Sequence, residues 1–138
     1  MSRNIPLKLR LQVAERAGYC CEYCRCSELD SVIGFEVDHI VSRKHGGLTV
    51  LENLAYACII CNRNKGSDLA TQFYPSKELI PLFNPRQDVW QDHFEYDDGL
   101  IIEKTDVGKA TIKILDLNHV DRIIERRIQA ESGSYPSS

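Results

Sequence analysis

The order of apolar and polar positions predicts short helices and strands along the first half of the chain. Residues 6–17 have apolar positions that fit a helix ending at Gly18. The segment 31–40 is rich in β-branched and aromatic residues, which predicts a strand ending near His39. The apolar run LAYACII, residues 54–60, is too short for its periodicity to separate a strand from a buried turn of helix.

The second half predicts a β-hairpin followed by two helices. Two short apolar runs surround Asp98 and Gly99, a pair typical of the tight turn between antiparallel strands. Thr105 is suited to cap the helix that follows, because its hydroxyl can accept a hydrogen bond from a free backbone N–H. Four apolar side chains of the last helix are expected to face the core: Val120, Ile123, Ile124 and Ile128.

These elements predict an α+β fold, and 138 residues is the size of one domain. We expect residues 1–75 to form the functional core, built around two metal-binding knuckles. Residues 76–130, with the hairpin and the two helices, are expected to pack on that core as a C-terminal extension. Residues 131–138 read as a flexible tail.

The charge of the chain argues against a protein that holds nucleic acid by bulk electrostatics, because the net charge is −3. Residues 1–75 contain 9 Lys and Arg against 8 Asp and Glu, whereas residues 76–138 contain 8 against 12. An anionic substrate is therefore expected at the N-terminal half, with a metal ion supplying positive charge. No apolar run approaches the roughly 20 residues that span a bilayer. The first residues lack an apolar signal region, so we expect a cytoplasmic protein without a membrane partner.

Six cysteines in a reducing compartment favour metal binding over disulfides. Two C-x2-C pairs, Cys21 with Cys24 and Cys58 with Cys61, supply the four thiolates that a tetrahedral zinc ion prefers. The 33 residues between the pairs exceed the compact zinc-ribbon spacing, so a substantial element must lie between the knuckles. The cysteines at positions 20 and 26 leave the register open, because either could replace a neighbour as ligand. Buried cysteines can also act as small apolar residues.

Asp38 and His39, at the end of the strand predicted over 31–40, offer a hard oxygen ligand beside an imidazole. A carboxylate suits Mg²⁺ or Mn²⁺, and a neutral histidine can take a proton from water near pH 7. Adjacent strand residues point to opposite faces, so the two can serve one site only if the strand ends or bends there. The flexible pair Gly46 and Gly47 that follows is compatible with such a bend. Taken alone, the two residues would be read as an ordinary surface pair.

Three stretches, VDHIVSRKHGG, ENLAYAC and CNRNKG, together resemble the HNH endonuclease family in pattern and order. The resemblance implies a ββα-metal finger that hydrolyses DNA phosphodiester bonds. It makes His39 the general base, Asn53 the middle residue of the motif and Asn62 the third, where many members have histidine. By the same resemblance Asp38 and Asn62 would hold one hard divalent cation, and Asn53 would pin the loop and orient His39. Segments after residue 80 also resemble the C-terminal extension of a bacterial subgroup.

Five side chains that flank this site are candidates for contacts to DNA: Lys65, Arg63, Arg43, Lys44 and His45. Solvated surface charges, or a loop histidine without a role, are the alternatives, and only Lys65 matches a family position. Two other functions stay open. A nuclease subunit that is active only with a protein partner would fit the acidic second half. A non-catalytic zinc module that binds nucleic acid would need neither Asp38 nor His39.

Overall fold

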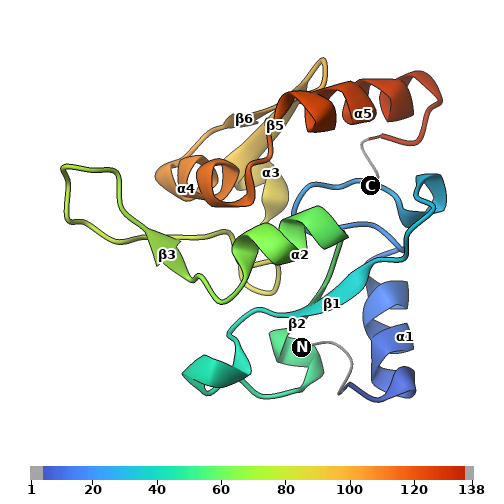
Figure 1. Ribbon diagram of the computed structural model, residues 1–138, viewed down its shortest axis with the longest axis horizontal. Coiled ribbons are helices and arrows are strands. Elements are labelled where there is room, and N and C mark those ends of the chain that lie inside the picture. The colour runs from blue at the N-terminus through green and yellow to red at the C-terminus, as the bar shows by residue number, and fades with distance from the viewer. Residues whose placement is uncertain (1–4, 136–138) are drawn as a thin grey trace.

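The computed structural model of the protein describes residues 5–135 (Figure 1). The described chain mixes helices with three antiparallel sheets of two strands each, β1–β2, β3–β4 and β5–β6. The helices are α1 (Leu7–Arg16), α2 (Ile59–Lys65), α3 (Trp90–His93), α4 (Asp106–Leu115) and α5 (Val120–Glu131). The strands are β1 (Glu36–His39), β2 (Leu54–Ala57), β3 (Ala70–Thr71), β4 (Ile80–Pro81), β5 (Phe94–Asp97) and β6 (Leu100–Glu103).

Helix α1 covers the β1–β2 sheet, and the two share a small core of their own. Val13 and Ala14 of α1 pack there with Val37 of β1 and Leu54 of β2. The helix ends before Gly18, whose φ of +66° lies in the left-handed region that glycine adopts without strain. The predicted N-terminal helix is thus confirmed.

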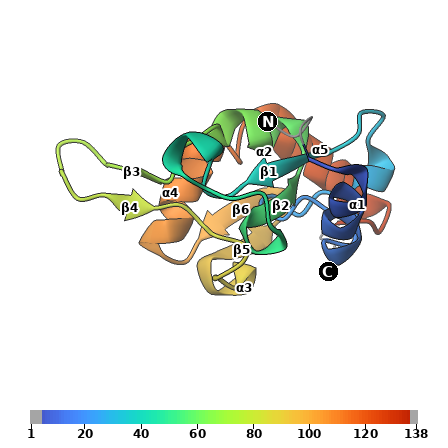
Figure 2. The same ribbon diagram turned by 90° about the horizontal axis from the view of Figure 1, so that it is seen from below.

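Strands β1 and β2 and helix α2 follow one another and form the centre of the molecule (Figures 1 and 2). β1 runs antiparallel to β2, with Asp38 opposite Ala55 and His39 opposite Leu54. The ambiguous run at 54–60 contains both a strand and the start of a helix, since β2 ends at Ala57 and α2 begins two residues later. Cys58, between β2 and α2, caps the helix, because its sulfur accepts a hydrogen bond from the backbone N–H of Cys61.

The C-terminal extension contains the predicted hairpin and both predicted helices. Asp98 and Gly99, which join β5 to β6, both have positive φ, as a two-residue hairpin turn requires. Thr105 caps α4 by accepting a hydrogen bond from the backbone N–H of Gly108. These local predictions are confirmed.

The predicted orientation of the last helix is wrong. Val120, Ile124 and Ile128 of α5 are 61%, 49% and 61% exposed, and only Ile123 of the four is half-buried. The residues that α5 buries are polar instead: Arg122, Arg126 and Gln129. The helix has the expected amphipathic pattern but is turned with its polar side towards the protein.

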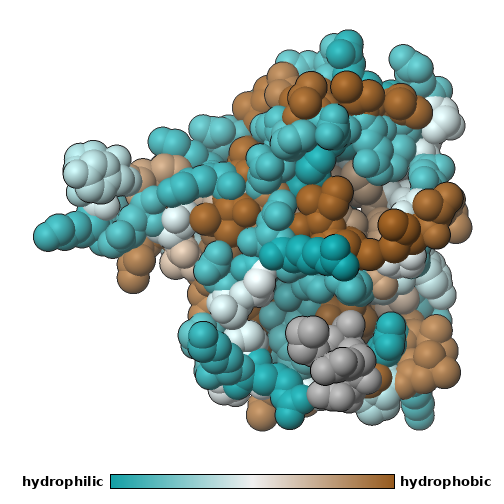
Figure 3. Space-filling model, in the orientation of Figure 1, coloured by the Kyte–Doolittle hydropathy of each residue, from teal (hydrophilic) through white to brown (hydrophobic). Residues whose placement is uncertain are grey.

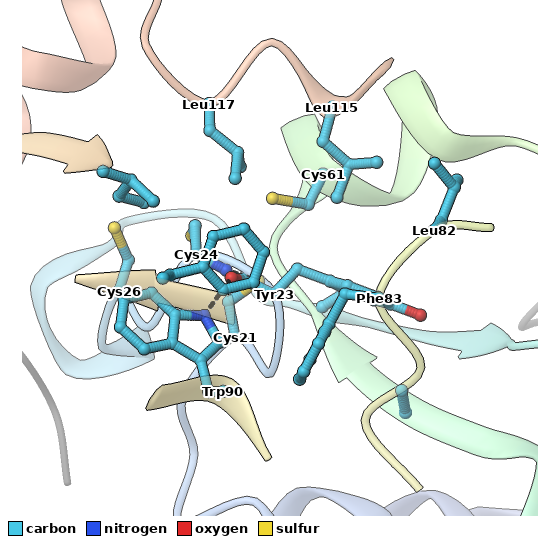
Figure 4. Packing of buried hydrophobic residues seen from close by; sticks show 14 of the residues in the cluster. Cys21, Tyr23, Cys24, Cys26, Cys61, Leu82, Phe83, Trp90, Leu115 and Leu117 are labelled. Atoms are coloured by element: carbon cyan, nitrogen blue, oxygen red, sulfur yellow. Dashed lines mark hydrogen bonds between the residues drawn. The ribbon is translucent and has the colours of Figure 1, made fainter. Parts of the chain in front are cut away.

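The extension and the cysteine knuckles share one core (Figure 4). Trp90 of α3 and Leu115 and Leu117 at the end of α4 lie in the same buried cluster as the cysteines. Tyr135 also reaches this cluster and is buried, although it belongs to the segment 131–138 that was expected to be a flexible tail. Residues 136–138 of that segment lie outside the described residues.

An arm formed by β3 and β4 projects from the body of the molecule (Figure 2). Throughout residues 5–135, the helices are too short or too polar to cross a membrane.

Candidate functional site

Four cysteine sulfurs from two distant parts of the sequence converge in the core. The Sγ atoms of Cys21, Cys24, Cys58 and Cys61 all lie within 4.8 Å of one another. Cys24 Sγ is 3.8 Å from Cys58 Sγ. Four sulfurs bound to zinc at about 2.3 Å in a tetrahedron would be about 3.8 Å apart. The cluster therefore fits a structural zinc ion.

The two remaining cysteines lie outside this four-sulfur group. Cys20 donates its thiol to the carbonyl of Gly18 and forms an isolated β-bridge with Ser27. Cys26 is buried, and its carbonyl accepts a hydrogen bond from the backbone N–H of Cys21. The register of the knuckles is thus the one that the C-x2-C spacing favours.

Burial makes these thiolates costly without a cation. The pKa values of the Cys21 and Cys61 thiols lie well above the usual value, and burial is the main cause. A bound Zn²⁺ would keep all four sulfurs deprotonated, but it would offset only two of their four negative charges. The site therefore needs further positive charge from the protein.

Arg122 of α5 supplies that charge and was not found from the sequence. Its Nη2 donates to Cys61 Sγ at 2.9 Å and lies 3.8 Å from Cys58 Sγ. Its Nη1 donates to the carbonyl of Leu115 at 2.7 Å. Burial alone would lower the pKa of Arg122, but the neighbouring cysteine sulfurs raise it above its usual value. Two arginines spaced four residues apart, on a helix far from the cysteines in sequence, do not indicate such a role.

That second arginine, Arg126, is fully buried one turn later. Its guanidinium donates to the carbonyls of Gly99 and Leu117 and to the side chain of Asn118, at 2.6 to 3.1 Å. All three partners are neutral, and Arg126 lines the same small hollow as Cys24 and Cys58. Charge balance at the cysteines thus explains the burial of Arg122, whereas hydrogen bonds to backbone carbonyls hold Arg126 inside.

Two further contacts tie the extension to the first knuckle. Trp90 donates from Nε1 to the carbonyl of Tyr23 at 2.8 Å (Figure 4), and Tyr135 donates from its hydroxyl to the carbonyl of Cys24 at 2.8 Å. Both bonds are buried, so the backbone of the knuckle is satisfied only when the extension is in place.

A cleft of about 460 Å³ opens where β1 ends beside α2. It is lined by Glu36, Val37, Asp38, His39, Ser42, Arg43, Asn62, Arg63, Gly66 and Ser67. His39 Nε2 lies 2.9 Å from Thr49 Oγ1, which orients the ring from the following loop. Burial is the first cause that lowers the pKa of His39, and the charges of Arg43 and Lys65 lower it further. The imidazole is therefore neutral at neutral pH, as a general base must be.

Asp38 is buried at the back of the cleft and already has two partners. Its Oδ2 accepts a hydrogen bond from Tyr23 at 2.7 Å and lies 3.1 Å from Lys65 Nζ. Burial raises the pKa of Asp38, while Lys65 and Tyr23 act against that shift and favour the carboxylate. The acid is held in place, and it retains lone pairs for another ligand.

Asn62 lies one helical turn before Lys65 on α2. It contacts β1 at Glu36, two residues before the Asp38 that Lys65 contacts. Its Nδ2 donates to Glu36 Oε1 at 2.8 Å. Glu36 and Asp38 are on one face of β1 because they are two residues apart, so α2 sets Asn62 against the first and Lys65 against the second. Glu36 is a carboxylate of the cleft that the sequence analysis did not single out. The alternation of side chains along the strand EVDH, which puts Glu36 on the same face as Asp38, could have identified it.

Residues 21–68, which contain both the cysteine cluster and the cleft, match the family model described as HNH endonuclease. This segment of the chain is therefore similar to an HNH endonuclease domain. It is also 29% identical over 122 residues to the Septu protein PtuB of Bacillus thuringiensis. That alignment covers 87% of this chain but 45% of the relative, so this chain spans about half the length of that protein. No solved structure matches the chain significantly.

Asn53 in this segment holds the loop between β1 and β2. Its Oδ1 accepts from the backbone N–H of Val41 at 2.9 Å, and its Nδ2 donates to the carbonyls of Val41 and Leu48, also at 2.9 Å. The side chain does not line the cleft. These contacts are those of a residue that pins the loop carrying Thr49.

The five side chains proposed to contact DNA fall into three groups. Arg43 and Arg63 are exposed and line the cleft, whereas Lys44 and His45 are exposed on the adjoining 3-10 helix. Lys65 is 2% exposed, and its ammonium also donates to the carbonyl of Ile40 at 3.0 Å. This placement speaks against a direct phosphate contact by Lys65, because its donors are used inside the domain.

Replacing Gly47 with alanine should disrupt the loop. A Cβ there would lie 1.7 Å from the carbonyl oxygen of Val41 and 2.8 Å from Asn53 Nδ2, so backbone must move. We expect Gly47→Ala to lower the free energy of unfolding by about 2–4 kcal/mol, measured by chemical denaturation. Gly34→Ala is the matched control, since its Cβ would meet only Glu28 Oε2 at 3.6 Å. Equal stability of the two variants would contradict the described loop.

Replacing Arg122 with methionine should weaken the cysteine cluster, because two thiolates lose their nearest cation. Loss of one partner from a buried charged pair costs about 3–5 kcal/mol, and loss of such an outer contact weakens metal binding about 10- to 100-fold. Zinc retention is measured by titration with a chelator, and stability by thermal unfolding. Arg127→Met on the exposed side of α5 is the control, and Cys61→Ser is the reference for a destroyed site. Zinc retention equal to wild type in Arg122→Met would refute the role given to this arginine.

Proposed function

We propose that this protein is a metal-dependent endonuclease that hydrolyses phosphodiester bonds of DNA. The observation that carries the proposal is the cleft, which is lined by neutral His39 together with Asp38, Asn62 and Glu36. We further propose that β1, β2 and α2 form the ββα-metal arrangement, with the cysteine cluster as its structural zinc site.

His39 takes the proton of the attacking water in this proposal. Thr49 engages Nε2, which leaves Nδ1 as the proton acceptor and fixes the plane of the ring. Because the ring is neutral before the reaction, it can accept this proton without first losing one.

Asn62 and the two carboxylates would hold a divalent cation. Asn62 donates through Nδ2 to Glu36, which leaves its oxygen Oδ1 to face a metal ion, and Asp38 has a lone pair besides those given to Lys65 and Tyr23. An all-oxygen set favours Mg²⁺ or Mn²⁺ over softer ions. When bound, such an ion supplies positive charge for the phosphate and the leaving oxygen. Arg43 and Arg63 are placed to contact neighbouring phosphates, and Lys44 and His45 lie one step further along the loop.

The division of labour along the chain is also part of the proposal. Residues 1–75 form the nuclease unit, and residues 76–130 support it through the core they share with the knuckles. We place the protein in the cytoplasm, because its six cysteines are free and a four-thiolate site requires reducing conditions.

A second candidate is a nuclease subunit that a protein partner activates. It is favoured by the buried contact between Lys65 and Asp38, which occupies part of the proposed metal ligand. Cleavage by the isolated chain would remove the need for a partner. A non-catalytic zinc module would not require the paired oxygens and the neutral imidazole in one cleft.

Replacing His39 with alanine should lower the rate of DNA cleavage about 10²- to 10⁴-fold, the usual value of a general base. The measurement is nicking of supercoiled plasmid by purified protein with Mg²⁺ or Mn²⁺. His119→Asn, which keeps a capping side chain at the start of α5, is the control. Thermal unfolding checks that both variants fold. No metal-dependent cleavage by wild type, alone or with co-purifying proteins, would reject the nuclease function.

The pH dependence of cleavage should report the lowered pKa of His39. Protonation abolishes a general base, so the rate should fall only as pH drops through a value below the usual pKa of about 6.5. Removing a nearby cation should move that midpoint upwards. We therefore expect Arg43→Gln to shift the acid limb to higher pH and Lys44→Gln to shift it less. Identical profiles for wild type and Arg43→Gln would contradict the electrostatics of the cleft.

A further inference from the structure

The outward face of α5 carries a row of large apolar side chains. Val120, Ile124 and Ile128 are four residues apart, so they lie above one another on one side of the helix. All three are at least 49% exposed. Figure 3 shows this row as a band of hydrophobic surface along the helix at the top of the molecule. An aligned apolar row of this kind is a typical feature of a binding surface.

The row is exposed because the other side of the helix is needed inside. Arg122 donates to Cys61 and Arg126 to buried backbone carbonyls, and the two sides of one helix cannot both be buried against a single core. Rotating α5 to hide the isoleucines would expose the arginines and leave the thiolates without compensation. The exposed row is therefore fixed by the fold.

Acidic side chains border this row. A groove of about 350 Å³ beside α5 is lined by Asp30, Asp121, Ile124, Glu125, Ile128, Gln129 and Ser132. The lining thus includes three carboxylates and neither lysine nor arginine. Arg127, the exposed cation of the helix, is paired with Asp98 at 3.1 Å on the other flank.

The apolar surface continues across Glu125 into a second hollow of about 190 Å³. Its wall includes Ile33, Ile59 and Ile60, from the segment before β1 and from the start of α2, and at its inner end the buried arginines of α5. Ile33 and Ile60 are themselves 60% and 46% exposed. A binding segment longer than the α5 row would find further apolar contacts there.

We propose that this α5 face is the docking surface for a basic amphipathic segment of a protein partner. Apolar side chains of that segment would cover Val120, Ile124 and Ile128, and its lysines or arginines would meet Asp30, Asp121 and Glu125. Apolar anchors framed by complementary charges are the usual way in which a groove recognises an amphipathic helix.

The charges favour this occupant over two others. In an antiparallel pair of α5 helices from two copies, each flank would face the same flank of the other copy, so Asp121 and Glu125 would approach their own equivalents. Anionic lipid would also be repelled by three carboxylates. DNA is disfavoured at this face for the same reason.

The inference does not rest on the proposed nuclease function. In Figure 1, α5 lies on the far side of α2 from the loop that follows β1. A partner on α5 would leave the cleft open. A failure of peptide binding at this surface would therefore not count against DNA cleavage, and a failure of cleavage would not count against peptide binding.

The test uses a fluorescein-labelled amphipathic peptide with leucine on one helical face and lysine on the other. We expect saturable binding to the full chain by fluorescence anisotropy. Ile124→Ser with Ile128→Ser should raise the Kd at least about tenfold, since two apolar contacts are lost. Asp121→Asn with Glu125→Gln should raise it several-fold and reduce its dependence on salt. Leu7→Ser, at a still more exposed leucine on α1, should leave the Kd unchanged.

Several results would overturn the proposal. These are absence of peptide binding, equal binding of a matched leucine and glutamate peptide, and equal affinity in Ile124→Ser with Ile128→Ser. Sedimentation equilibrium that shows a dimer lost in that double variant would assign the face to a second copy instead. Binding to phosphatidylcholine and phosphatidylserine vesicles, lost in the same variant, would assign it to a membrane.

Discussion

The buried charge of the four-cysteine cluster is the constraint on which most of this structure depends. Thiolates buried at this depth are unfavourable without cations, and a zinc ion of the kind that the cluster fits leaves part of their charge uncompensated. Arg122 compensates part of the remaining charge by donating to Cys61. This single contact joins the first residues of α2 to the last helix of the chain, 61 positions away.

The position of the C-terminal extension follows from this contact. Once Arg122 and Arg126 must point inward, α5 is fixed in rotation, and its apolar residues are left at the surface. The hydrogen bonds from Trp90 and Tyr135 to the knuckle backbone then hold the extension from two further sides. The extension therefore forms the second half of the surroundings of the cysteine cluster, and the same requirement leaves the apolar residues of α5 exposed.

The cleft depends on the cluster in turn, because α2 begins at the second cysteine pair. Cys58 caps the helix and Cys61 lies in its first turn, so the position of the sulfurs sets the position of Asn62 and Lys65. Those two side chains then meet Glu36 and Asp38 of β1. These two polar contacts hold α2 against β1, so that the acidic side chains and the neutral histidine line one cleft.

The sequence by itself determined several local elements and the four cysteines that converge in the core. Turn chemistry at Asp98 and Gly99, the cap at Thr105 and the C-x2-C spacing act over a few residues, so they can be found without the fold. The tertiary structure alone decided what depends on contacts between distant segments. It showed that Lys65 is buried against Asp38, that Glu36 joins the cleft, and that α5 presents its arginines inward. An amphipathic pattern predicts that a helix has two unlike faces, but the charge of the neighbouring core decides which face is buried.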